Sequence, residues 1–508
     1  MRSVYVLFLL FGFNLLSIAV TKADQAILIG GGYNLNSSQG QIEYNVKWVQ
    51  NVLKNAELPV ATFFTDGSDP APDVHYLHIA SNSAEPSAVD TLAAQLEPVA
   101  RLFENRLANQ RRYRNHNIED IQGGTVADKL TQDLKDLLAS KPDEPSLIVF
   151  NGHGLQSKTS IDKVTMELWN NTHINVTELH SIFSRSKAPN RFLFTQCYSG
   201  GFHRLAYKNP EKGLALSDTT RCGFTAESAY RLAEGCSASV DTDDYRDYTT
   251  YFFAALDGYD RNGNMLPVET DTNGDGGVSL REAHFYTLEN AHSTDLPRST
   301  SEDYLATWQP WYLKWVAETP TLQNNEYAKI FRVLAGRYDI SLTDNPAKVI
   351  RKNMQAYRKK ADDLKAQQSE LQLAISGVQH RLINVAQSKW PSLARPYTAL
   401  FQSMSASGEM IKVANWLREQ PNYQTMVDLQ NKNDNIVQAL LKNERDTTQM
   451  HKMLHFRNIA KLKRQIYEYG TQEQIKDYEK LVACEDTPLV FSEQPHTEQP
   501  ILNSQISD

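Results

Sequence analysis

Short apolar runs alternate with amphipathic stretches along the first part of the chain. Unbroken apolar runs are typical of strands that are buried on both faces, whereas apolar residues spaced three and four apart predict helices. We therefore expect strands over 25–29, 61–64, 146–150, 192–194 and 223–226, and helices over 44–53, 89–112, 125–139, 176–183 and 280–291. Strands that alternate with helices predict an α/β fold, in which helices cover both faces of a mostly parallel sheet.

A different pattern begins near residue 345. Mostly apolar residues follow each other at alternating spacings of four and three from Ile350 to Val385, and again from Met426 to Leu454. The polar members are Gln368 in the first stripe and Asn433, Asn443 and Thr447 in the second. Such stripes are typical of coiled coils and predict two long helices that pack antiparallel, with shorter helices between them. We expect an all-α helical domain over 345–485, a connector over 317–344 before it and a disordered tail over 486–508 after it.

The first residues have the pattern of a signal peptide. Arg2 precedes an apolar run over 4–20, and the small residue Ala23 offers a cleavage site. An uncleaved membrane anchor is the alternative, although the run is barely long enough to span a bilayer. We expect a signal peptide over 1–23, a secreted or periplasmic protein, and no transmembrane segment after signal cleavage.

Length and charge narrow the function further. A chain of 508 residues exceeds what a single core usually organises, so at least two domains are expected, the first over 24–316. The formal net charge of −8 gives no indication of nucleic-acid binding.

Four cysteines remain to be assigned. In an oxidising compartment cysteines usually pair as disulfides, but a nucleophilic thiol must stay free. Cys222 and Cys236 are close in sequence and are expected to form a disulfide, which leaves Cys197 free. Cys484 is then unpaired and competes for either partner.

Two of the predicted strands lead into residues that can perform nucleophilic chemistry. His153 follows the strand over 146–150 and Cys197 follows the strand over 192–194, each beside glycines. Parallel strands end at one edge of a sheet, so a common cleft is expected for both side chains. An imidazole next to a thiol can take its proton and can later protonate the leaving amine. The pair predicts a cysteine nucleophile with a histidine acid–base partner.

At these residues the sequence resembles the caspase/legumain type of cysteine peptidases. Members have an apolar strand that ends in His-Gly and, roughly 40–50 residues later, one that ends in Gln/Glu-Ala-Cys and glycine. The resemblance covers about residues 24 to 290. It implies a caspase-like sheet domain that hydrolyses peptide bonds without a cofactor, with His153 and Cys197 as the dyad. It also implies an oxyanion hole made by the backbone N–H groups of Gly154 and Cys197.

The resemblance has departures that concern specificity. Members usually keep Gln or Glu two positions before the cysteine in the primary specificity pocket, where this chain has Thr195. Glu227 could offer a carboxylate to a basic substrate side chain, or it could be a surface residue. Legumain-like enzymes also carry a helical C-terminal segment that covers the active site until it is cut away. This chain is similar in order and helicity, and a structural hairpin or an oligomer contact is the alternative.

A second motif lies over 271–282. Its twelve residues match the EF-hand calcium loop, with Gly276 at the sharp turn. A regular incoming helix is not expected, because Pro267 precedes the loop. The oxygen ligands for calcium are expected from Asp271, Asn273, Asp275, Gly277, Ser279 and Glu282.

These expectations combine into an exported cysteine endopeptidase that acts on protein or peptide substrates and holds a structural calcium ion. One alternative is a catalytically inactive caspase-like binding module. The other is an envelope or assembly protein that self-associates through its C-terminal helices.

Overall fold

The computed structural model describes residues 25–77, 88–103, 110–213, 215–315, 324–343, 345–395 and 398–489. The predicted signal peptide over 1–23 lies outside the described residues. Within the described ranges, no helix is both long and apolar enough to cross a membrane.

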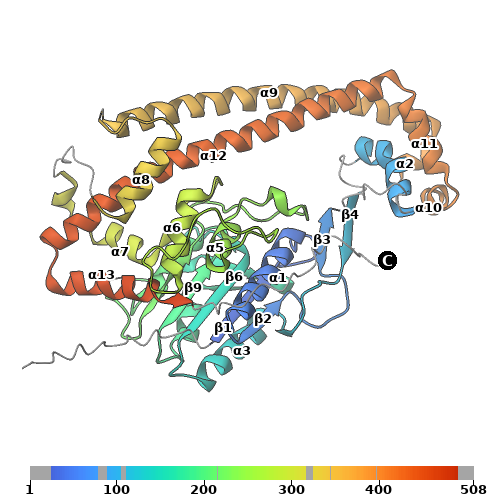
Figure 1. Cartoon of the computed structure of the whole chain (residues 1–508). Helices are drawn as coiled ribbons and strands as arrows, with labels where there is room; N and C mark the ends of the chain where they lie inside the picture. Colours follow the sequence, from blue (N-terminus) through green and yellow to red (C-terminus); the bar gives the residue numbers. More distant parts are fainter. Residues whose placement is uncertain are drawn as a thin grey trace, which may run out of the picture.

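A mostly parallel sheet forms the centre of the first domain (Figure 1). Six neighbouring strands run parallel, and the short edge strand β12 (Arg298–Ser299) is antiparallel to β10. The parallel strands, in spatial order, are β10 (Arg221–Thr225), β9 (Asn190–Phe194), β6 (Ser146–Leu155), β1 (Gln25–Gly31), β2 (Val60–Phe64) and β5 (Ile121–Gly123). All five predicted strands are present, and β5 is one that the apolar pattern did not predict.

Helices cover both faces of this sheet, as predicted. Strand residues alternate between the two faces, so that Leu28 joins the core under one helical layer and Ile27 joins the core under the other. The first layer contains α1 (Gly40–Asn55), α5 (Tyr248–Asp257) and α6 (Leu280–Asn290). The second contains α3 (Ala127–Ser140), α4 (Val176–Phe183) and η4 (Ser199–Ala206).

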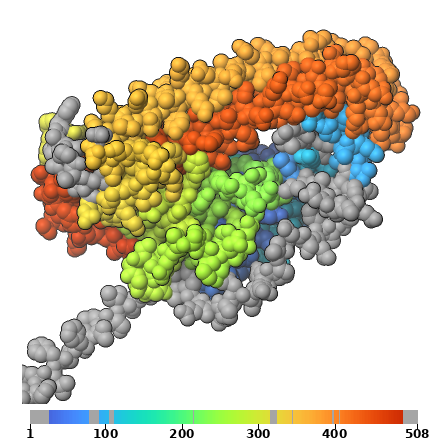
Figure 2. All heavy atoms as spheres, turned by 45° about the horizontal axis from the view of Figure 1, so that its top comes forward, coloured from blue at the N-terminus to red at the C-terminus, as the bar shows by residue number. Residues whose placement is uncertain are grey.

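The C-terminal part is all-α and has the predicted order. The two long helices, α9 (Pro346–Lys389) and α12 (Pro421–Tyr469), lie side by side and extend across the sheet domain. Figure 2 shows their side chains as one continuous layer over that domain. They bury Ile350, Leu382 and Met426 from the predicted stripes. The shorter helices of this part are α10 (Ala399–Ala406), α11 (Glu409–Arg418) and α13 (Gln472–Glu485).

The helical part and the sheet domain share a hydrophobic core. The predicted connector contains α8 (Glu326–Arg337), whose residues Tyr327 and Phe331 are fully buried. They pack with Phe456 of α12 and with Leu305 of α7 (Thr300–Trp308). The two domains are therefore joined by a packed interface rather than by a simple linker.

Two boundary predictions are wrong for reasons of long-range pairing. The helix expected over 89–112 is α2 (Ala88–Phe103), and β4 (Arg111–Arg114) pairs instead with β3 (Val74–Leu77). The tail was expected to be disordered from residue 486, but β13 (Pro488–Leu489) pairs with β11 (Val278–Ser279). The rest of the tail, residues 490–508, lies outside the described residues.

The predicted disulfide between Cys222 and Cys236 is wrong. Cys222 is bonded to Cys484, with 6.1 Å between the two Cα atoms. Cys222 lies in β10 and faces a small core that includes Leu481 of α13, so the packing of that helix brings Cys484 to it. Cys236 lies elsewhere and, like Cys197, is a free cysteine.

Candidate active site

His153 is positioned by an extension of strand β6. Beyond its parallel neighbours β6 continues to pair with the antiparallel strand β7 (Thr165–Leu168), where His153 lies opposite Glu167. Strand β7 pairs in turn with β8 (Thr172–Asn175), and neither strand was predicted. The histidine is thus held within a strand, rather than in a turn after its end.

Two acceptors fix the orientation of the His153 ring. Nε2 lies 2.8 Å from the carbonyl oxygen of Ser37 and 2.9 Å from Oε1 of Gln39. Because both partners accept, Nε2 carries the proton and Nδ1 is left as a basic nitrogen. Burial lowers the pKa of His153, although the Ser37 carbonyl opposes this effect. A neutral imidazole with an available Nδ1 is therefore the resting state at neutral pH.

Cys197 follows strand β9 at the same height of the sheet. Strands β6 and β9 are parallel neighbours in which Phe150 is in register with Phe194, and His153 and Cys197 each lie three residues further on. Gly154 touches the cysteine backbone so closely that a Cβ there would lie 2.2 Å from the Cys197 carbonyl oxygen. The structure therefore brings the two predicted catalytic residues to one edge of the sheet.

The Cys197 thiol is protonated at rest. Its sulfur accepts a hydrogen bond from the backbone N–H of Ala233 at 3.3 Å. Burial raises the pKa of the Cys197 thiol, and the nearby carboxylates of Asp295 and Glu227 raise it further. The hydrogen bond with the Ala233 backbone lowers this pKa and so opposes the shift. A protonated thiol needs a base before it can act as a nucleophile, and Nδ1 of His153 is a basic nitrogen at this edge.

Cys236 is the residue of this site whose position the sequence did not reveal. Its sulfur lies 3.8 Å from Nδ1 of His153, and the thiol hydrogen points to that nitrogen because Nε2 is already protonated. The segment over 231–236 thereby reaches both residues of the dyad, through Ala233 at Cys197 and through Cys236 at His153. The predicted pairing with Cys222 had placed Cys236 away from the chemistry.

Helix α12 holds this segment from outside the sheet domain. Arg445 forms an ion pair with Glu234, and the Arg231 guanidinium donates to Oγ1 of Thr448 at 3.4 Å. Glu234 is also bound from the other side, because its backbone N–H donates to the buried Asp295 at 2.6 Å. The helical domain therefore contacts the site through the segment over 231–236.

Neither predicted specificity residue is open to a substrate in this structure. Thr195 is buried; its hydroxyl donates to the Phe150 carbonyl at 3.1 Å and accepts from the Asn151 amide at 2.9 Å. Glu227 is fully buried and pairs with Arg231 at 3.2 Å, so it is not the surface carboxylate of the alternative. Burial raises the pKa of Glu227, and Arg231 opposes the shift.

Gln196 is a polar group at the site that the predictions left without a role. Its side chain is buried, and among the described residues neither its oxygen nor its nitrogen has a hydrogen-bond partner. A buried amide without partners costs roughly 1–3 kcal/mol. Its Cγ lies next to Gly154, where an added Cβ would be 2.7 Å away. The Gln196 amide is therefore a candidate for contact with a polar substrate group.

The predicted calcium loop adopts a turn with the expected polar groups inside it. Asp271 accepts from the backbone N–H groups of Gly274 and Gly276 at 2.7 and 3.0 Å, and Gly276 has a φ of +90° that suits glycine. Glu282 accepts from the backbone of Thr272 at 2.8 Å and so closes the loop. Its other oxygen accepts from Ser279 at 2.9 Å, which caps helix α6. The donor set and the closed turn fit a hard cation such as calcium.

A second group of possible metal ligands gathers beyond strand β2. Asp66, Asp73 and His116 place one ligand atom each within 4.8 Å of one another. Nδ1 of His116 lies 2.7 Å from the buried Asp73 carboxylate, so this hydrogen bond accounts for the arrangement without a metal. Burial and the carboxylates of Asp73 and Asp69 raise the pKa of Asp66 to about 6.

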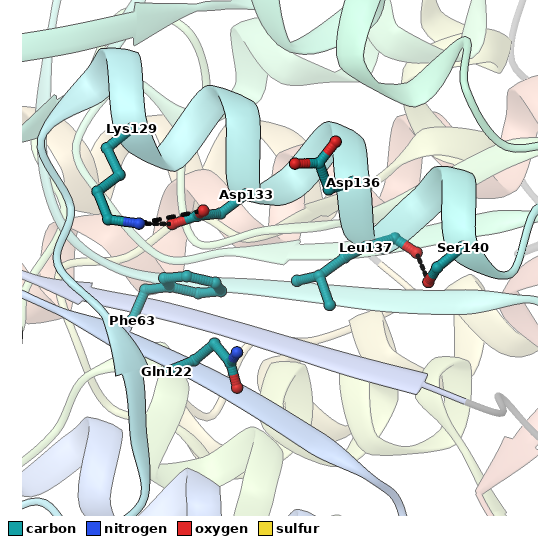
Figure 3. Close-up of a pocket in the computed structure, with 7 residues that line it drawn as sticks. All are labelled: Phe63, Gln122, Lys129, Asp133, Asp136, Leu137 and Ser140. Atoms are coloured by element: carbon teal, nitrogen blue, oxygen red, sulfur yellow. Dashed lines mark hydrogen bonds and ion pairs between the residues drawn. The ribbon is translucent and has the colours of Figure 1, made fainter.

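A separate hollow, which neither His153 nor Cys197 lines, lies against helix α3 (Figure 3). Lys129 and Asp133 of this helix form an ion pair of 2.9 Å across its rim. None of the residues that line it belongs to the predicted site. The lining consists of Phe63, Gln122, Lys129, Asp133, Asp136, Leu137 and Ser140.

Comparisons with known proteins identify no relative from which a function can be taken. The chain matches no family model and no curated protein sequence. Among solved structures it is similar to the Drosophila initiator caspase Dronc, with a TM-score of 0.28 and 10% identity over 55% of this chain and 80% of that chain. It is also similar to Raptor from Chaetomium thermophilum, with a TM-score of 0.23 and 11% identity, over 46% of this chain and 17% of that chain. At these values the likenesses carry no conclusion about activity.

Proposed function

We propose that the chain is a cysteine endopeptidase in which Cys197 is the nucleophile and His153 is the acid–base residue. The observation that carries this proposal is the matched placement of the two residues, three positions beyond registered residues of adjacent parallel strands. The fixed orientation of the imidazole supports it, because Ser37 and Gln39 hold Nε2 and leave Nδ1 unprotonated, on the side that faces the thiols.

The chemistry follows from these two groups. Nδ1 of His153 takes the thiol proton as the Cys197 sulfur attacks the peptide carbonyl, and it then gives the proton to the leaving amine. The backbone N–H groups of Gly154 and Cys197 would stabilise the oxyanion, and the close contact of these two residues supports this pairing. Water then hydrolyses the thioester, so no cofactor is needed for the chemistry.

Substrate binding requires the segment over 231–236 to move. The Cys236 thiol lies 3.8 Å from Nδ1 of His153, which is the nitrogen that must exchange a proton with Cys197. The buried Gln196 amide has no hydrogen-bond partner among the described residues. It is the group proposed to bind a polar substrate side chain, which is consistent with protein or peptide substrates.

Export and calcium binding belong to the same proposal. The signal-like sequence over 1–23 supports a secreted or periplasmic protein, and the disulfide between Cys222 and Cys484 suits an oxidising compartment. A calcium ion would be held by the residues of the loop over 271–282. The ion would neutralise the negative charge of the loop carboxylates. Arg281, within the same loop motif, pairs with Glu485 at 3.3 Å.

The dyad is tested by labelling with an electrophilic thiol probe and by peptidase assay. Labelling of Cys197 should be mapped by mass spectrometry in the wild type, in His153→Ala and in Cys197→Ala. We expect His153→Ala to lower peptidase activity by at least a factor of about 10³, as for other dyad members. The double variant should be no worse than either single variant. Hydrolysis that survives Cys197→Ala in a pure preparation would exclude the assigned nucleophile.

The same assay separates the enzyme from the two alternatives. An inactive binding module would show no hydrolysis and no dependence of Cys197 labelling on His153. An assembly protein would also lack hydrolysis, and a mass measurement in solution would show self-association.

A further inference from the structure

The cysteines of this chain fall into two pairs, and one of the pairs lies at the proposed active site. Cys222 and Cys484 are joined, which leaves Cys197 and Cys236 as the two free thiols. Cys197 is partly buried, whereas Cys236 is exposed. Cys236 is therefore the more exposed residue of the free pair, although its thiol group turns toward His153.

One short segment connects both free thiols to the dyad. The backbone N–H of Ala233 donates to the Cys197 sulfur at 3.3 Å, and three residues later the Cys236 sulfur lies 3.8 Å from Nδ1 of His153. Consecutive Cα atoms are about 3.8 Å apart, so Cys236 cannot lie far from Cys197. The charge of Cys197 also contributes to the raised pKa of Cys236, after burial of the Cys236 thiol group itself.

A shared metal ion is not supported as the reason for this gathering. Among the described residues, the ligand atoms of Cys197, Cys236 and His153 do not all lie within 4.8 Å of one another. At least one of the three distances is therefore longer, and a direct bond between the two sulfurs requires the segment over 231–236 to bring them together.

The backbone next to Cys236 can supply that movement. Gly235 has a φ of +127°, a conformation that other residues rarely adopt, and glycine can leave it at little steric cost. Glu234 is held by Asp295 and Arg445 on one side, and Ser237 is held by Gln41 at 3.0 Å on the other, so the movement is confined to Gly235 and Cys236 between them.

We propose that Cys197 and Cys236 form a reversible disulfide that closes the active site under oxidising conditions. This inference rests on the proposed function for its consequence, but the bond itself does not depend on peptidase activity. Formation of the bond removes the nucleophile and fixes the segment over 231–236 against His153.

The oxidant in this reaction is a small organic disulfide such as oxidised glutathione. The Cys236 thiol gives its proton to Nδ1 of His153, and its sulfur attacks the glutathione disulfide to form a mixed disulfide and release one glutathione thiolate. The Cys197 sulfur then attacks the Cys236 sulfur and releases the second glutathione. Two protein thiols are oxidised, one small disulfide is reduced to two thiols, and both protons pass to the released thiolates.

The order of the two exchange steps predicts which disulfide each variant should form. The wild type should give a peptide pair in which Cys197 is joined to Cys236. Cys236→Ala, and independently Cys236→Ser, should give glutathione attached to Cys197 instead. Cys197→Ala should stop at glutathione on Cys236. The bond between Cys222 and Cys484 should be present in every sample and serves as the internal control.

The experiment is peptide mapping of the full chain under non-reducing conditions, after incubation with oxidised glutathione and acid quenching. We expect the Cys197–Cys236 peptide pair to appear, and dithiothreitol at low concentration to remove it. Wild-type protein in which both residues instead carry separate glutathione groups, or both remain free while the internal control is intact, would overturn the proposal.

Failure of this inference and failure of the proposed function can be told apart. Peptidase activity is measured on the reduced wild type, and the disulfide is measured by mass without any substrate. If the bridge forms in a chain that hydrolyses nothing, the inference stands and the proposed function falls. If the reduced chain is active and oxidised glutathione never joins the two residues, the inference falls and the function stands.

Discussion

The disulfide between Cys222 and Cys484 makes a quantitative prediction about stability. It joins strand β10 to helix α13 across a sequence separation of 262 residues. In the chain-entropy model a ring of this size restricts the unfolded chain by ~5.5 kcal/mol, against a more typical measured effect of ~2–4 kcal/mol. Replacing both cysteines by alanine also removes two sulfurs from a buried cluster, which adds on the order of 1 kcal/mol. The double variant should therefore lose at least ~3 kcal/mol.

Urea denaturation followed by tryptophan fluorescence measures this loss. Cys222→Ala and Cys484→Ala each break the same bond, so each single variant should lose nearly as much as the double variant. Cys236→Ala is the matched control, because it removes an exposed free cysteine and leaves the bond intact. If the double variant unfolds at the same urea concentration as the wild type, the reasoning is refuted. Single losses that add up in the double variant would also contradict it.

Three further predictions concern the site and the calcium loop. Because burial raises the pKa of Cys197 above its ordinary value of 9.0 and lowers that of His153 below 6.5, labelling assisted by His153 should fall only below pH 6.5, stay level up to about pH 9 and rise again as the thiol ionises; labelling that falls steadily from pH 9 to pH 6.5 would show that the thiolate reacts without the base and would contradict this. Gln39→Ala should lower kcat/KM by up to about tenfold, the equivalent of one hydrogen bond, while Gln39→Glu should move the acid limb of the pH profile upward because a carboxylate stabilises imidazolium. Calcium in hundredfold excess over Kd should stabilise the wild type by about 2.7 kcal/mol, and Asp275→Ala with Glu282→Gln should abolish the upward shift in Tm; a shift that persists would exclude the loop.

The role of the helical domain is also changed by the structure. The legumain-like order of domains suggested that the helical domain over 345–485 is released when the connector over 317–344 is cut. Here α8 lies in that connector and packs with α12, and Cys484 remains bonded to Cys222 after any cut there. Release would therefore need both reduction of the disulfide and separation of a shared core.

Local signals in the sequence predicted the strands and the two candidate catalytic residues. Unbroken apolar runs are typical of central strands that are buried on both faces. The sequence therefore predicted β1, β2, β6, β9 and β10. Because parallel strands share one carboxyl edge, the sequence assigns His153 and Cys197 to that edge, and the adjacency of β6 and β9 in the sheet brings them together. The long stripes over 350–385 and 426–454 determined α9 and α12 in the same way, since a repeat of three and four is unambiguous over that length.

Only the tertiary structure decided which distant groups meet. The partner of Cys222 depends on where α13 docks, and no spacing along the chain encodes a contact between residues 222 and 484. Short polar strands such as β4 and β13 exist because a distant strand supplies their hydrogen bonds, so their own residues give no apolar signal. The position of Cys236 beside His153 has the same origin, because the segment that carries it is held by Asp295 and Arg445 from other elements. The sequence determines where chemistry can occur, and long-range packing determines what controls access to it.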